Sequence, residues 1–309
     1  MTLSSRDVGK LGEIATLFEV SGYPKPGNVH RTQNFDDMYY EDFLISSVCI
    51  GEHIENVVYK AQKYSPYFLN KINMGKDILG CVESANKLTN TNTNLGISML
   101  IIPIAATYAT LTPEDSLNKI ANTMDILLRN TGEDDAIALI KAIIISKAGG
   151  MEHKTTQYDA NNKNTINDII ENKVNMYKLL EISAKYDKIS YELTNQLPVI
   201  TTIGTPTFLE TINEYSINDT TLQTYLTILS KTPDTLITRK YGEEIAQTIS
   251  DKATTILEDT EVASKKRLDS LNEFDKYLRS KKYNPGTTAD FTAASIFMGL
   301  LYKYSESGI

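Results

Sequence analysis

The sequence lacks a hydrophobic run long enough to cross a membrane. A transmembrane helix needs about 20 consecutive apolar residues, whereas the longest apolar run, residues 97–109, is interrupted by Ser98, Pro103 and Thr107. Residues 1–10 are polar and do not have the charged-then-apolar order of a secretion signal. We therefore expect a cytoplasmic protein with no membrane partner.

Cysteine and histidine are scarce, with two and three copies respectively. Cys49 and Cys81 fall at apolar positions of helical patterns, which is typical of buried thiols rather than of a disulfide. His30, His53 and His153 are far apart along the chain. The sequence therefore lacks the spacing that a zinc site or a cysteine–histidine nucleophile needs.

Basic residues are fewer than acidic residues. The 309 residues include 31 Lys and Arg against 39 Asp and Glu, which gives a formal net charge of −8. Because a nucleic-acid backbone requires a basic protein face, we expect no nucleic-acid partner. Hydrophobic residues make up 41% and charged residues 23%, a composition typical of a globular protein with a sizeable core.

Patterns typical of β-strands are almost absent. Apolar residues instead recur every three or four positions, as in amphipathic helices. The pattern that begins near Asn94 is apolar on nearly every side, so we expect that helix at the centre of the protein. The one strand candidate, residues 199–204, is short and isolated. Helical patterns cover residues 40–58, 74–88, 94–105, 117–128, 133–147, 166–184, 207–215, 236–256, 268–278 and 291–300.

No linker, internal repeat or block of like charge divides the chain. We therefore predict an all-α fold, a single-domain multi-helix bundle over residues 1–309 with a buried central helix.

The most distinctive stretch covers residues 284–295. Pro285 and Gly286 predict a sharp turn, after which Thr287 stands at a helix N-cap with Asp290 as its capping-box partner. Three alanines near Asp290 leave room for a ligand or another backbone to approach its carboxylate. Asp290 is therefore expected either to cap the helix alone or to serve in a site.

A second stretch, residues 23–31, places Lys25 between Pro24 and Pro26. Each proline fixes its φ near about −65°, so Lys25 is held on a stiff, non-helical segment. Such a lysine suits an anionic ligand, because little chain entropy is lost on binding. The alternative is a solvated surface loop.

Two further groups of charged residues follow. Asp36, Asp37 and Glu41 are oxygen donors of the kind that holds magnesium. Arg239 and Lys240 lie one turn inside a helix whose start is marked by a threonine, a proline and an aspartate at residues 232–234. For these two cations the alternative is a solvated helix face.

Four polar motifs stand out along the chain. They are Pro24-Lys25-Pro26-Gly27 with Asp36-Asp37-Met38, Asn92-Thr93-Asn94-Leu95-Gly96, Asp234-Thr235-Leu236-Ile237-Thr238-Arg239-Lys240-Tyr241-Gly242 and Asn284-Pro285-Gly286-Thr287-Thr288-Ala289-Asp290. Taken in order, these motifs resemble those of the triphosphoribosyl-dephospho-CoA synthase family. The resemblance covers about residues 19–300. The sequence departs from the family pattern at residues 28–35 and 149–160, which leaves the acceptor open.

The resemblance implies an all-α transferase that moves the 5-triphosphoribosyl unit of ATP onto a ribose hydroxyl of 3′-dephospho-CoA and releases adenine. The product would be the precursor of the prosthetic group of citrate or malonate lyase-type acyl carrier proteins. The expected partners are ATP and dephospho-CoA, or a similar acceptor, with Mg²⁺ on the triphosphate. A homo-oligomer is compatible with this prediction.

Breaking the bond between ribose and adenine builds positive charge on the sugar, as in glycoside hydrolysis. This chemistry calls for carboxylates near the ring and for cations on the triphosphate. We expect Asp290 and Asp37 to be the catalytic carboxylates. Lys25, Arg239 and Lys240 are the expected phosphate ligands, and arginine can bind two oxygens at once. The acids at 36, 37 and 41 are the expected magnesium ligands.

Asn94 is expected to bind a sugar hydroxyl or the adenine edge, or to cap its helix. Two other functions stay open at this point. One is pentosyl or phosphoribosyl transfer to a different acceptor in another cofactor pathway. The other is a non-catalytic helical nucleotide-binding or scaffold protein. A hydrolase that uses a magnesium-held water is a weaker third alternative.

Overall fold

The computed structural model describes residues 3–35, 38–89, 91–112, 115, 117–147 and 157–307, and this part of the chain is helical. Within those residues the sole β-type pairing is an isolated antiparallel bridge between His30 and Gln33. The predicted all-α fold is therefore confirmed.

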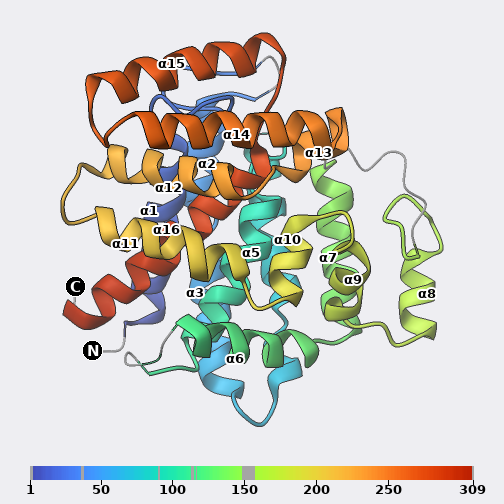
Figure 1. Cartoon of the computed structure of the whole chain (residues 1–309). Helices are drawn as coiled ribbons and strands as arrows, with labels where there is room; N and C mark the ends of the chain where they lie inside the picture. Colours follow the sequence, from blue (N-terminus) through green and yellow to red (C-terminus); the bar gives the residue numbers. More distant parts are fainter. Residues whose placement is uncertain are drawn as a thin grey trace.

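The helices follow one another as an irregular bundle (Figure 1). The first half contains α1 (Ser5–Ser21), α2 (Tyr40–Cys49), α3 (Gly51–Tyr64), η1 (Leu69–Lys71), α4 (Met74–Thr89), α5 (Leu95–Tyr108), α6 (Leu117–Arg129) and α7 (Glu133–Ser146). The second half contains α8 (Thr165–Glu171), α9 (Met176–Ser183), α10 (Lys188–Thr194), η2 (Ile200–Gly204), α11 (Thr205–Thr211), α12 (Ile217–Lys231), α13 (Thr235–Tyr241), α14 (Glu243–Asp259), α15 (Lys265–Ser280) and α16 (Gly286–Ser307).

Helix α5 is the central helix that the sequence predicts. All of its residues except Gly96 and Tyr108 are buried. It packs against α3, α4, α6 and α16, and Figure 1 shows it in the middle of the molecule. A helix that is apolar on every side is stable only when neighbours cover all of its faces, and here they do.

A second hydrophobic cluster joins α12, α14 and α15, which lie above the main core in Figure 1. Tyr225 of α12 and Phe274 of α15 are fully buried in it. The Tyr225 hydroxyl donates to the carbonyl oxygen of Pro26 at 2.8 Å. This cluster therefore anchors the proline-rich loop that follows α1.

The structure corrects several predicted elements. Residues 199–204 do not form a strand, because Ile200–Gly204 are π-helical and run directly into α11. Ile200 and Thr201, two of the β-branched residues that suggested a strand, are instead buried in this helical segment. The pattern over residues 166–184 divides into α8 and α9, and the pattern over residues 236–256 divides at Gly242, whose φ is 95°. Ile50 likewise separates α2 from α3.

The sequence predicts no helix that crosses a membrane. Across the described ranges, each helix is too short or too polar to traverse a lipid bilayer.

Candidate active site

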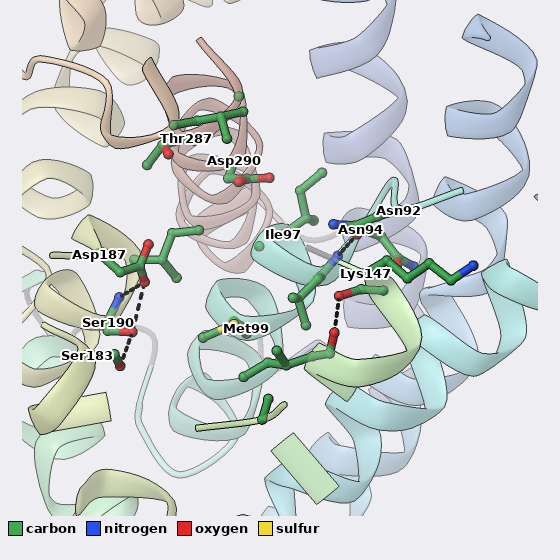
Figure 2. Close-up of a pocket in the computed structure, with 18 of the residues that line it drawn as sticks. Asn92, Asn94, Ile97, Met99, Lys147, Ser183, Asp187, Ser190, Thr287 and Asp290 are labelled. Atoms are coloured by element: carbon green, nitrogen blue, oxygen red, sulfur yellow. Dashed lines mark hydrogen bonds between the residues drawn. The ribbon is translucent and has the colours of Figure 1, made fainter. Parts of the chain in front are cut away.

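A cavity of about 680 Å³ opens between the start of α5, the ends of α7 and α9, and the first turns of α10, α13 and α16. Figure 2 shows Asp290 of α16 near the start of α5, with Asp187 on one side and Asn94 on the other. A volume in this range suits a nucleotide-sized ligand. The polar residues of its wall include Glu19, Asn28, Asn94, Lys147, Asp187, Ser190, Arg239, Lys240, Asn284, Thr287 and Asp290.

The two proline–glycine turns that the sequence singles out meet at the edge of this cavity. The Asn28 side-chain amide donates to Asn284 Oδ1 at 2.8 Å. Gly27 has a φ of 74°, and a Cβ there would lie 2.7 Å from the carbonyl oxygen of Tyr283. Only glycine satisfies both conditions, so Gly27 lets the two turns approach closely.

Asp234 joins the starts of α13 and α16. Its Oδ1 accepts from the backbone N–H groups of Leu236 and Ile237 at 2.8 and 3.1 Å, which caps α13. Its Oδ2 accepts from the backbone N–H and the hydroxyl of Thr288 at 2.8 and 2.9 Å. One buried carboxylate thus supplies the acceptors that two helix N-termini need.

The predicted capping box at Thr287 is therefore wrong. Helix α16 begins at Gly286, and Asp234 supplies the cap from another part of the chain. The Thr287 hydroxyl instead shares a 3.0 Å hydrogen bond with the hydroxyl of Thr235. Asp290 is thus not needed as a cap, and its carboxyl group lies free at the cavity.

Asp290 is an acid without a hydrogen-bond partner among the described residues. A Cβ on Gly96 would lie 2.2 Å from Asp290 Oδ2, so the carboxyl group rests against bare backbone at the start of α5. Burial raises the pKa of Asp290 well above its ordinary value, the nearby charges of Glu19, Asp234 and Asp187 raise it further, and Arg239 opposes the rise. Burial and the neighbouring acids thus favour the protonated form of this acid.

Arg239 and Lys240 both line the cavity, as the sequence predicts for substrate contacts. Arg239 Nη1 donates to Asp187 Oδ1 at 3.0 Å, and Asp187 Oδ2 caps α10 through the backbone N–H of Ser190 at 2.9 Å. Arg239 Nε is buried and has no partner in the described structure. The guanidinium is therefore held in place with donor capacity to spare, while Lys240 is exposed.

Lys25 does not reach the cavity, which differs from the prediction of a direct phosphate ligand. Its side chain is fully buried and forms an ion pair with the carboxylate of Glu19 on α1. Its Nζ also donates to the Glu19 carbonyl oxygen at 3.0 Å. Glu19, rather than Lys25, lines the cavity.

Asn94 lies at the N-cap position of α5, but its side chain does not cap the helix. Its amide nitrogen donates to the carbonyl oxygen of Cys81 at 3.1 Å, and Asn94 remains part of the cavity wall. The adjacent Asn92 accepts from the backbone N–H of Leu95 at 3.4 Å instead. Asn94 is therefore positioned for ligand contact.

The predicted magnesium ligands are not brought together at the cavity by the described residues. Glu41 is exposed on the first turn of α2 and does not line the cavity. Asp36 and Asp37 lie outside the described residues, although the next residue, Met38, lines the cavity. Over the described ranges no group of three His, Cys, Asp or Glu side chains could hold a metal ion. These ligand assignments stay predictions.

The far end of the cavity is apolar. Side chains of α7 and α9 line it, together with Met99 of α5. The apolar lining residues include Leu139, Ile140, Ile143, Leu179, Leu180 and Ile182. The cavity thus has one charged end and one apolar end.

Four residues of the site escaped sequence reasoning: Glu19, Asn28, Asp187 and Asn284. Asp187 precedes Ser190 by three residues, a spacing that signals a helix N-cap. Asn28 and Asn284 are part of the quoted motifs, but their contact spans 256 residues and has no local signal. No sequence pattern marks Glu19 either, because Lys25 contacts it only once the loop between them has folded.

A family model described as ATP:dephospho-CoA triphosphoribosyl transferase (CitG) matches residues 5–308. No curated protein gives a significant sequence match. The chain is also similar to the crystal structure of an Archaeoglobus fulgidus protein that is provisionally assigned as a triphosphoribosyl-dephospho-CoA synthase. The TM-score is 0.62 at 23% identity, over 84% of this chain and 98% of that one. At this identity the similarity supports the fold alone.

Proposed function

Because the chain belongs to the ATP:dephospho-CoA triphosphoribosyl transferase family, we propose that it transfers the 5-triphosphoribosyl group of ATP to a ribose hydroxyl of 3′-dephospho-CoA and releases adenine. The observation that carries the proposal is the shared cavity of Asp290 and Arg239, an acid and a cation from distant motifs. Such a pair meets the two needs of the reaction, because the leaving base must be protonated and the triphosphate must be held.

The charged end of the cavity is the proposed triphosphate site. Arg239 is fixed by Asp187, and an arginine fork can bind two phosphate oxygens at once. Lys240 follows Arg239 on α13, also lines the cavity and is exposed. Asp187 offsets part of the arginine charge, so Lys240 adds net positive charge toward the phosphates.

Asp290 is the proposed general acid. Cleavage of the bond between ribose C1′ and adenine leaves excess electron density on the base, which a proton neutralises. Burial and the surrounding acids raise the pKa of Asp290, which favours the protonated form that a general acid needs. Its proton passes to a ring nitrogen of adenine as the bond breaks. General acids of this kind contribute about 10²- to 10⁴-fold in rate.

The apolar end is the proposed site of the acceptor's pantetheine arm. That arm is largely hydrocarbon and amide, and burying it against Ile140, Ile143 and Leu179 removes apolar surface from water. Mg²⁺ would enter with ATP as part of the substrate, since this ion is usually bound by phosphates together with one or two carboxylates. Asp36, Asp37 and Glu41 remain the predicted carboxylates.

To test this function, the purified protein is incubated with MgATP and dephospho-CoA. Adenine is then measured by chromatography, and the nucleotide product is identified by mass spectrometry. We expect adenine and triphosphoribosyl-dephospho-CoA in equal amounts. Adenine that appears only with a different acceptor would favour transfer in another cofactor pathway. Tight ATP binding with no product for any acceptor would favour a non-catalytic nucleotide-binding protein.

A further inference from the structure

Glu19 is a buried acid at the wall of the cavity that the proposed function has not yet used. It lies near the end of α1, its side chain is 2% exposed, and it lines the same cavity as Asp290. A buried carboxyl group is costly unless something compensates it. At this wall the compensation comes from Lys25.

Lys25 fixes the orientation of Glu19. The lysine ammonium contacts both Glu19 Oε1 and the Glu19 carbonyl oxygen, so one cation holds the side chain and the backbone of the same residue. Pro24 and Pro26 restrict the backbone on either side of Lys25. The second carboxyl oxygen, Glu19 Oε2, has no hydrogen bond with any group in the described part of the chain, and so it is available to a ligand.

Glu19 and Asp290 line the same cavity, but the charges that neighbour them have opposite effects on their pKa values. Burial raises the pKa of both groups. For Glu19 the charge of Lys25 opposes this rise, whereas for Asp290 the charge of Glu19 adds to it. When one proton is shared between the two, it resides on Asp290. Two carboxyl groups whose surroundings separate their protonation states are typical of an acid–base pair.

We propose that Glu19 is the general base that accepts the proton of the acceptor's ribose hydroxyl, and that Lys25 is a positioning residue that holds its carboxylate. This inference rests on the proposed function. In the step, the acceptor oxygen forms a bond to C1′ of the ATP ribose while the bond from C1′ to adenine breaks. The hydroxyl proton moves to Glu19, the Asp290 proton moves to adenine, and adenine leaves neutral. Solvent then returns one proton from Glu19 to Asp290.

Azide distinguishes a base from a structural residue, because the azide anion attacks C1′ without having to lose a proton. We expect Glu19→Gln to lower adenine release with dephospho-CoA by about 10²- to 10⁴-fold. Added azide should then restore adenine release and give triphosphoribosyl azide. Asp290→Asn should not be restored by azide, since its leaving group still lacks a proton. Glu13→Gln makes the same substitution on α1 outside the cavity and should stay within twofold of wild type.

Because Glu19→Gln leaves Lys25 as a buried unpaired cation, the double variant Glu19→Gln/Lys25→Met is measured in the same way. It contains no unpaired charge at this position and should show the same loss and the same restoration by azide. Lys25→Met alone should shift the acidic limb of the kcat/KM profile to higher pH, because Glu19 loses the cation that favours its ionised form.

The outcomes separate this inference from the proposed function. No adenine from wild-type protein with ATP and dephospho-CoA would overturn the function itself. A working wild type together with a Glu19→Gln variant within threefold of its rate would overturn only the role of Glu19. A folded but inactive double variant that azide does not restore would overturn it as well.

Discussion

Asn28 and Asn284 are joined by a 2.8 Å hydrogen bond although 256 residues separate them. This contact brings the loop after α1 to the turn before α16, at the edge of the cavity. The charged end of the cavity therefore depends on contacts between distant segments rather than on one continuous motif.

Asp290→Asn is expected to abolish adenine release and to leave the fold intact. The ionised form of Asp290 is disfavoured in the folded protein because its pKa is raised there. Folding therefore loses stability as pH rises above the unfolded pKa, and the uncharged asparagine removes that loss. Thermal unfolding at pH 7 should show an equal or higher melting temperature for the variant, with adenine release reduced about 10²- to 10⁴-fold.

Asp259→Asn, at the exposed end of α14, is the matched control and should change neither property. Near-normal adenine release from Asp290→Asn would remove Asp290 from the mechanism.

Gly96→Ala should displace the Asp290 carboxyl group, because the new Cβ would lie 2.2 Å from Oδ2. We expect lower kcat for adenine release and a loss of about 1–3 kcal/mol in the free energy of unfolding. Gly132→Ala is the control, since a Cβ at that position meets no atom within 4 Å. Equal effects of the two substitutions on kcat would contradict the close approach of α5 to Asp290.

Asp234→Ala removes the acceptor shared by α13 and α16. Three backbone N–H groups and one hydroxyl lose their partner, so we expect the free energy of unfolding to fall by about 2–4 kcal/mol. Urea denaturation measures this change. Ser216→Ala removes an exposed cap on α12 and should cost about 1 kcal/mol. A smaller loss for Asp234→Ala than for the control would argue against the joint cap.

Arg239→Gln should weaken ATP binding more than it slows the chemical step. The guanidinium is positioned by Asp187 and keeps an unpartnered Nε. Loss of a charge-assisted contact of about 1.5–3 kcal/mol corresponds to a rise in KM for ATP of about 10- to 150-fold. Arg6→Gln, on the exposed side of α1, should leave KM unchanged. If KM for ATP stayed at the wild-type value, the phosphate site would have to be elsewhere.

Glu192 predicts a pH dependence of stability. It is fully buried, its carboxyl oxygens accept from the backbone N–H groups of Val199 and Ile200, and burial raises its pKa to about 7. Between the ordinary pKa of 4.5 and pH 7 the unfolded chain releases a proton that the folded protein retains. The contribution of Glu192 to the free energy of unfolding should therefore fall by about 3 kcal/mol across this window and stay constant above it.

Urea denaturation of wild type and Glu192→Gln from pH 4.5 to 8.5 measures the contribution of Glu192 to the free energy of unfolding, because the other groups titrate equally in both proteins. Parallel stability curves for the two proteins would show that Glu192 does not titrate in this range.

Helical periodicity was enough to predict the fold. The central position of α5 follows from a helix that is apolar on all sides, and the structure confirms it. Residues 199–204 do not form the strand that their β-branched residues suggest, because local preference for β structure yields to packing when the segment continues directly into the following helix, α11. The Glu192 carboxylate accepts from the first backbone N–H groups of this turn, a contact that no local pattern reveals.

The candidate site was predicted in part, through its motifs. Asp290 and Arg239 were found because turn and helix-start signals surround them, and both line the cavity. Lys25 was expected to be accessible, because no pattern in the sequence reveals that Glu19 neutralises it in the interior. Asp234 shows the same limit, since the sequence marks residues 232–234 as a helix start but does not reveal that Asp234 is the N-cap of α13 or that it also bonds to Thr288.

The shared wall of α1 and α16 has a consequence for synthesis on the ribosome. Residue 19 emerges before residue 290, so the nascent chain cannot form the complete cavity until α16 has been synthesised. A ligand that contacts both walls therefore cannot assist the folding of the earlier helices before α16 emerges. A protein released before residue 284 would lack both the hydrogen bond to Asn28 and the acid on α16.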